Sequence, residues 1–126
     1  MINHALLKQA IHDISSIQYL EMDPKQLALD VYALSTIFKD ETKFKNVINS
    51  VINAIINLKN NPSMGEDLKY NLAEWKSYHF FSPYPIYPED EDMRLVYQSV
   101  LTNILILGFG HRYIPSDFYS RLSNRI

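Results

Sequence analysis

The stretch DMRLVYQSVLTNILILGFGHRY, residues 92–113, constrains the fold more than any other part of the chain. Its two runs, 93–100 and 103–109, are rich in Val, Ile, Leu and Tyr, which favour the pleated, half-buried surface of a β-sheet. The sequence therefore predicts an antiparallel hairpin with a tight turn around Thr102 and Asn103. Such a turn sets Arg94 opposite His111. A change of one residue in loop length would set it opposite Arg112 instead.

The first sixty residues have a helical pattern. DPKQLALDVYALSTIFK has Asp23 as N-cap and Pro24 at the first helical position, and DETKFKNVINSVINAIINLKNNP begins with the cap Asp40 and stops at Pro62. The sequence predicts helices at 24–38 and 41–60 that form an antiparallel hairpin, a short helix at 3–14, and a weak strand pattern over 15–22. The expected core positions have helical spacing and are Leu27, Val31, Leu34, Phe38, Phe44, Val47, Val51, Ile55 and Leu58.

After Pro62 the chain becomes richer in aromatic residues. A further strand is predicted at 74–81, where we expect Trp75 to anchor the sheet on the helical hairpin. The stretch SPYPIYPEDED, residues 82–92, has three prolines and four consecutive acids, so it must be a loop. A last short helix begins at Ser116 or Asp117.

These elements predict one α+β domain over residues 1–126. We expect a helical hairpin packed on a three- to four-stranded antiparallel sheet, with an extra N-terminal helix and a short C-terminal helix. Residues 1–14 are treated as an N-terminal extension and residues 82–92 as an insertion loop.

The charge of the chain limits its possible partners. With 12 Lys and Arg against 14 Asp and Glu, the net charge is −2, so any polyanion must be held by a local cluster of cations. The absence of cysteine excludes disulfides and thiolate metal sites, and we expect no metal or other cofactor. The N-terminus lacks the pattern of a signal peptide and no run is long enough for a membrane span, so a cytoplasmic protein without membrane contact is expected.

The open end of the hairpin is the predicted functional site. Arg94 and Arg112 offer planar donor groups that match phosphate oxygens, while His111 and Tyr119 can transfer protons. This combination suits a phosphodiester substrate. The competing interpretation is that the arginines form structural ion pairs with the acids of residues 89–92.

The tail MRLVYQSVLTNILILGFGHRYIPSDFYSRLSNRI resembles the end of the RelE/ParE superfamily of bacterial toxins, in which a strand of the form Tyr-Arg-Leu-Val-Tyr-Gln precedes a hydrophobic strand, a Gly-His-Arg or Gly-Lys-Arg motif and a helix that contains Tyr. Upstream, EDLKYNLAEWKSYHFF is similar to a segment of YoeB-like members. The resemblance covers about residues 15–126. It implies a RelE-like fold and the toxin of a type II toxin–antitoxin system, an endoribonuclease (mRNA interferase) that cuts mRNA in the ribosomal A site.

In that chemistry the ribose 2′-hydroxyl attacks the adjacent phosphate, and no metal is needed. The resemblance gives Arg94 the contact with the scissile phosphate and makes Arg112 the second arginine of the site. Tyr119 matches the tyrosine of the C-terminal helix that contacts the substrate, although it lies one residue further from Arg112 than in RelE-like members. His111 is a second candidate proton carrier.

The resemblance also implies RNA-binding residues on strand 74–81. Lys76 lies where related toxins carry their first basic residue, and Tyr78 and His79 occupy the neighbouring basic positions. Glu66 matches the general-base glutamate of YoeB-like members. The implied partners are a cognate antitoxin protein and mRNA on the ribosome.

Two alternatives stay open. One is a non-catalytic, ParE-like inhibitor of DNA gyrase, which the near-neutral charge favours. The other is a degenerate RelE-fold interaction protein, favoured by the acidic loop 82–92, which would repel RNA unless it moves aside as a lid.

Overall fold

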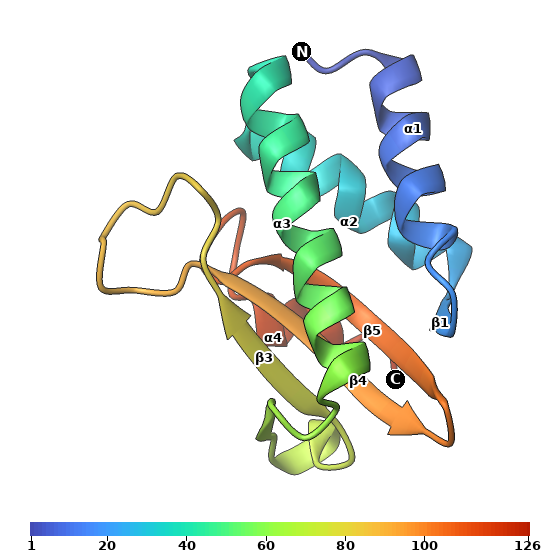
Figure 1. Ribbon diagram of the computed structural model, residues 1–126. Coiled ribbons are helices and arrows are strands. Elements are labelled where there is room, and N and C mark those ends of the chain that lie inside the picture. The colour runs from blue at the N-terminus through green and yellow to red at the C-terminus, as the bar shows by residue number, and fades with distance from the viewer.

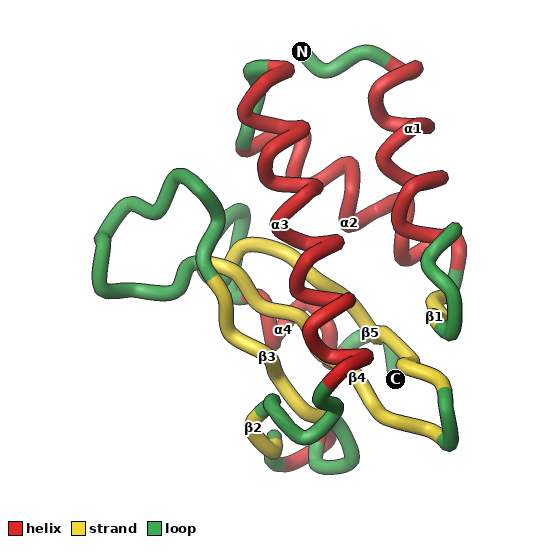
Figure 2. Tube along the Cα trace, in the orientation of Figure 1, coloured by secondary structure: helices red, strands yellow, loops and turns green.

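The computed structural model describes residues 1–126 as an α+β fold with helices on both faces of one sheet (Figure 1). In chain order the elements are α1 (His4–Ser15), β1 (Leu20–Met22), α2 (Pro24–Ile37), α3 (Glu41–Asn60), β2 (Glu66–Asp67), a 3-10 turn (Tyr70–Leu72), β3 (Lys76–Phe80), β4 (Met93–Val100), β5 (Asn103–His111) and α4 (Phe118–Ser123). Helices α1, α2 and α3 share one core with one face of the sheet, and α4 packs on the opposite face. Figure 2 shows the helices above the sheet and α4 behind it.

The helices begin where the sequence predicts, because their caps are local. The Asp23 carboxylate accepts hydrogen bonds from the backbone N–H groups of Lys25 and Gln26, and Asp40 accepts from Lys43. All nine predicted core positions are buried. Eight of them lie in α2 and α3, and the ninth, Phe38, directly follows α2. Residues 1–14 also belong to this core, since Ile2, Ala10 and Ile14 are buried in it. None of the helices has the length and apolarity that crossing a bilayer requires.

The sheet differs from the prediction in size and direction. It has five strands in the order β1-β5-β4-β3-β2, and β1 runs parallel to β5 while the other pairs are antiparallel. The wholly antiparallel sheet was therefore a wrong prediction. The long connection through α2 and α3 allows the first strand to enter the sheet in the same direction as the last.

The predicted register of the β4–β5 hairpin was also wrong. The turn lies one residue earlier, at Leu101 and Thr102, so Val100 pairs with Asn103. A bulge then leaves Leu107 without a partner and shifts the pairing by one residue. As a result Arg94 lies opposite Gly110, and neither His111 nor Arg112 faces it across the hairpin.

Trp75 does not contact the α2–α3 core as predicted. Together with Leu68 and Leu107 it packs against a small second cluster of Val96, Phe118 and Leu122 on the α4 face. The side chains of neighbouring residues in a strand point to opposite faces, and the sequence did not reveal which face Trp75 would take.

Side chains protect the outer edge of β5 where β1 ends. The last β1 residue, Met22, pairs with Ile106, and beyond it the Asp30 carboxylate accepts a hydrogen bond from Phe109 N at 3.0 Å. Arg125 donates to both Asp30 oxygens, at 2.9 and 2.6 Å, and to Leu107 O at 3.0 Å. We call these two side chains the Asp30–Arg125 clamp. They form hydrogen bonds with backbone groups of β5 that a longer β1 would otherwise pair with.

Gly108 makes room for the clamp. A Cβ atom at this position would lie 2.4 Å from Leu122 Cδ2 and 2.6 Å from Arg125 Nη1. A larger residue here would have to displace the ends of both side chains, including the guanidinium group of the clamp.

Candidate functional site

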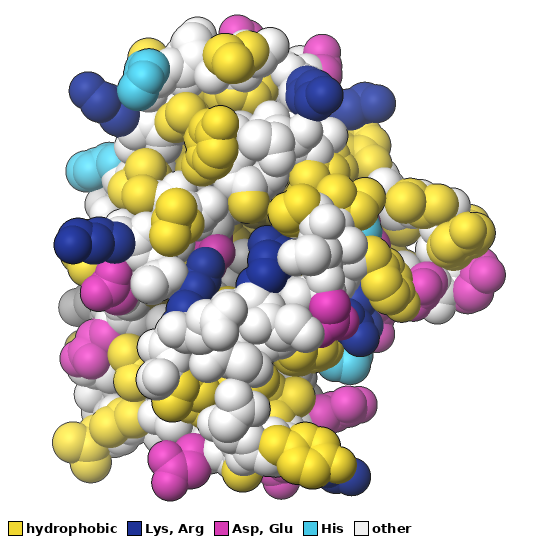
Figure 3. Space-filling model, turned by 180° about the vertical axis from the view of Figure 1, so that it is seen from behind, with side chains coloured by type: hydrophobic (Ala, Val, Ile, Leu, Met, Phe, Trp, Pro, Cys, Tyr) yellow, Lys and Arg dark blue, Asp and Glu magenta, His cyan; other side chains and the backbone are white.

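A cluster of polar side chains lies on the α4 face, at the end of the sheet where β3 ends and β4 begins. His79 on β3 pairs directly with Arg94 on β4, so their side chains point to the same face. Val96, two residues further along β4, packs on α4, which identifies that face. In Figure 3, which views the molecule from behind, histidine, basic and acidic side chains gather next to the loop that projects from the body.

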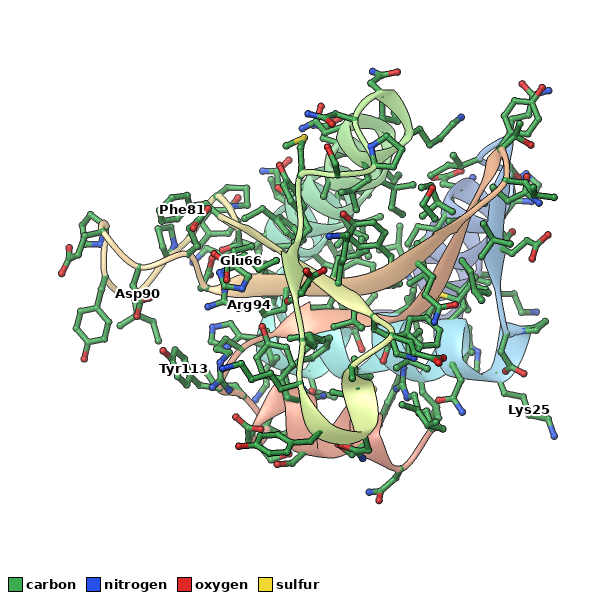
Figure 4. All side chains as sticks on the ribbon, turned by 90° about the horizontal axis from the view of Figure 1, so that it is seen from below. Lys25, Glu66, Phe81, Asp90, Arg94 and Tyr113 are labelled. Atoms are coloured by element: carbon green, nitrogen blue, oxygen red, sulfur yellow. The ribbon has the colours of Figure 1, made fainter.

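Tyr119 of α4 completes the cluster above the two strands. Its hydroxyl lies 2.8 Å from Ser77 Oγ and 3.4 Å from His79 Nε2. On the other side, the Glu66 carboxylate of β2 lies 4.0 Å from the same Nε2 atom. Four secondary-structure elements thus bring together the proton-exchanging groups of His79, Tyr119 and Glu66 beside Arg94. Figure 4 shows Glu66 and Arg94 at the same end of the sheet.

Arg94 carries a positive charge that the chain does not neutralise. The residue is buried, with 8% of its surface exposed, and no carboxylate oxygen lies within 4.0 Å of its guanidinium. Its Nη1 donates to the backbone oxygens of Glu91 at 2.5 Å and Met93 at 2.9 Å, while its buried Nε has no partner. Burying an unpaired charge is costly, so the arrangement favours binding of an anion there.

His79 is kept neutral by its surroundings. Burial lowers the pKa of His79 below its ordinary value of 6.5, and the positive charge of Arg94 lowers it further, against the opposing effect of Glu66. Near pH 7 the ring is therefore unprotonated and able to accept a proton.

Arg112 lies over the rings of two tyrosines. Its guanidinium carbon is 4.9 Å from the ring centre of Tyr119 and 5.2 Å from that of Tyr113, and the group also pairs with Asp117. The Arg112 charge contributes to lowering the pKa of His79. Arg112 is thus a second cation close to the cluster, although its charge is partly neutralised.

The structure does not bring His111 into the cluster. His111 pairs with Met93, whose side chain is buried in the core of the opposite face, and only 3% of His111 is exposed. Its Nδ1 accepts hydrogen bonds from the backbone N–H groups of Tyr113, at 3.1 Å, and Ile114, at 3.2 Å. The ring is thereby engaged in holding the segment after β5.

We expect His111 to make stability depend on pH. Burial lowers its pKa below 6.5 despite the nearby Asp92 carboxylate, so the unfolded chain binds a proton before the folded one does. The stabilisation is complete above pH 6.5 and is lost as the pH falls through the folded-state pKa. Urea unfolding at pH 7.5 and 5.5 should show a smaller pH effect in His111→Gln than in the wild type. The exposed control His4→Gln should keep the wild-type effect, and an unchanged pH effect in His111→Gln would contradict this prediction.

Two further predicted residues lie on the opposite face of the sheet, which α1, α2 and α3 cover. Lys76 and Tyr78 alternate with Ser77 and His79 along β3. Lys76 donates to Asp67 at 2.7 Å, and Tyr78 stacks on Phe80 with ring centres 5.8 Å apart. The structure therefore separates Lys76 and Tyr78 from the Arg94 cluster and leaves His79 in it.

The cluster lines no cavity. None of the cavities in the structure is lined by Arg94, His79 or Tyr119. No group of three or more His, Asp or Glu side chains is arranged to hold a metal ion. Sequence reasoning missed Ser77, whose only sequence signal was its position two residues before His79 in a predicted strand.

Comparison with known proteins adds no relative: no protein-family model, curated protein or solved structure matches this chain.

Proposed function

We propose that this protein is a metal-independent endoribonuclease, the toxin of a type II toxin–antitoxin system that cleaves mRNA in the ribosomal A site. The observation that carries the proposal is the contact of His79 with Tyr119 and Glu66 beside the unpaired guanidinium of Arg94. The ribosome and an antitoxin as partners are supported by the resemblance of the tail to RelE/ParE toxins.

Each group of the cluster has a role in the proposed reaction. Neutral His79 accepts the proton of the ribose 2′-hydroxyl as that oxygen attacks the adjacent phosphorus, and Glu66 stabilises the imidazolium that forms. Arg94 binds the phosphate oxygens, on which negative charge develops. The Tyr119 hydroxyl orients His79 and donates a proton towards the leaving 5′-oxygen. The products are a 2′,3′-cyclic phosphate and a 5′-hydroxyl end.

The absence of an enclosing cavity at the cluster is consistent with a polymeric substrate. A small-molecule site is commonly a cavity that encloses most of its ligand, and none is found here. An RNA strand can instead lie across the end of the sheet with one phosphate against Arg94.

Cleavage of a defined mRNA by purified protein in a translating-ribosome assay tests the proposal. We expect His79→Gln to lower the cleavage rate by about 100-fold or more and Tyr119→Phe by about 10-fold. General acid–base groups commonly contribute rate factors of about this order. The exposed histidine variant His4→Gln is the matched control and should cut at the wild-type rate. Wild-type activity in His79→Gln would show that another group is the base.

One observation favours the two non-catalytic alternatives, the degenerate interaction protein and, through the low net charge to which it contributes, the gyrase inhibitor. Glu89, Asp90 and Glu91 form no salt bridge, and the backbone oxygen of Glu91 accepts a hydrogen bond from Arg94 Nη1, so an uncompensated acidic segment adjoins the site and opposes RNA binding. Intact mRNA in the ribosome assay, together with inhibition of DNA supercoiling by gyrase, would support the gyrase inhibitor over the nuclease.

A further inference from the structure

Residues 82–92, here called the arm, project from the body of the protein. Figures 1 and 2 show the arm as a long loop between β3 and β4 whose tip stands away from the helices and from the sheet. The arm is not needed to connect two neighbouring antiparallel strands, for which a loop of two to five residues suffices. Its length therefore calls for an explanation other than chain connection.

The base of the arm is rigidly held. The buried Asp92 carboxylate accepts hydrogen bonds from Ser82 N at 2.8 Å and from Ser82 Oγ at 2.6 Å, which joins the two ends of the arm. The Tyr84 hydroxyl accepts from Asn46 Nδ2 at 2.8 Å and so ties the arm to α3. Prolines 83, 85 and 88 further restrict the backbone. An arm fixed in this way loses little conformational entropy when it binds a partner.

The tip of the arm exposes apolar side chains. Ile86 is 65% exposed and Tyr87 is 60% exposed, and across a hollow of about 30 Å³ they face Tyr113, which is 55% exposed. In Figure 3 hydrophobic side chains run along the arm, with acidic side chains at its far end. A contiguous apolar surface of this kind, rimmed by charges, is typical of protein–protein contact sites.

The charge of the arm indicates the kind of partner. Glu89, Asp90 and Glu91 follow the apolar tip directly, and none of them pairs with a cation of this chain. Three adjacent unpaired acids repel one another and a nucleic acid, and attract Lys and Arg. The apolar tip and the acids together match a segment with Leu, Ile or Phe on one side and Lys or Arg on the other.

We infer that the arm and Tyr113 form a docking surface for a basic, amphipathic segment of a partner protein. This inference does not depend on nuclease activity. It places the partner beside the cluster, because the Glu91 carbonyl of the arm accepts the hydrogen bond from Arg94 Nη1.

The probe for this surface is a synthetic helical peptide with Leu on one face and Lys on the other, titrated into the full-length protein by NMR and calorimetry. We expect the backbone signals of residues 84–91 and 113 to shift, with binding that weakens as salt is added. Ile86→Ser/Tyr87→Ser and Glu89→Gln/Asp90→Asn/Glu91→Gln should each weaken binding by at least about tenfold. The control Leu29→Ser alters a similarly exposed apolar side chain on α2 and should bind as the wild type does.

Three outcomes would overturn the inference. They are an absence of shifts at the arm, equal binding of a peptide in which Glu replaces every Lys, and preferential binding of polyuridine RNA at the arm. Binding is measured without mRNA or ribosomes, so a failed docking surface is distinguishable from a failed nuclease assignment.

Discussion

Arg94→Met is expected to abolish mRNA cleavage while leaving the fold intact. Removing the guanidinium removes the proposed donor for the phosphate oxygens, and we expect the cleavage rate to fall by about 100-fold or more. The unfolding free energy should change by no more than about 1 kcal/mol, because the loss of two hydrogen bonds to backbone oxygens is offset by relief of an unpaired buried charge. Single-turnover cleavage and urea unfolding of the same preparations measure both quantities.

The control for this experiment is Lys76→Met, which removes a cation from the opposite face of the sheet. It should retain cleavage near the wild-type rate. If Arg94→Met cut mRNA normally, or if both variants lost activity equally, Arg94 would not be the specific phosphate-binding group.

Breaking the Asp30–Arg125 clamp is expected to cause the largest loss of stability. Asp30→Ala leaves Arg125 without its charge partner and Phe109 N without its acceptor, and Arg125→Ala leaves a buried carboxylate. Each change should lower the unfolding free energy by about 3–5 kcal/mol. The double variant Asp30→Leu/Arg125→Met should lose less than the sum of the single changes, because no unpaired charge remains.

A salt bridge at the protein surface serves as the comparison for the buried Asp30–Arg125 clamp. Lys76 and Asp67 also form a salt bridge at 2.7 Å, but the Asp67 side chain is 83% exposed and the Lys76 side chain 35%. Lys76→Ala should therefore cost less than about 1 kcal/mol in urea unfolding. Similar losses for the two pairs would show that the clamp contributes no more than a surface contact.

The helices were predictable because their signals are local. Asp23, Pro24 and Asp40 fix the starts of α2 and α3, and apolar spacing fixes their buried faces. The direction of β1 and the register of β4 against β5 were not predictable. The three residues of β1 have no distinctive pattern, and the bulge at Leu107 depends on how β5 packs against its neighbours.

The candidate site was predictable residue by residue but not as an arrangement. Arg94, Tyr119, Glu66 and His79 were all identified from the sequence, yet His111 was preferred to His79 as proton carrier. Alternation along 76–80 already places His79 and Lys76 on opposite faces, and only the register shows that His79 is the residue opposite Arg94. Asp30 was missed, although a carboxylate within the apolar stripe of a helix is a signal for a buried partner.

The pairing of β1 with β5 has a consequence for how quickly the chain can fold. The first strand of the sheet hydrogen-bonds to the last, with Leu20 aligned to Ile104, whereas contacts among α1, α2 and α3 join segments close in sequence. Closing such a long loop is entropically slow, so the helices can assemble before the sheet is complete. Substitutions in β1 should then alter the refolding rate less than the unfolding rate, because its contacts form late.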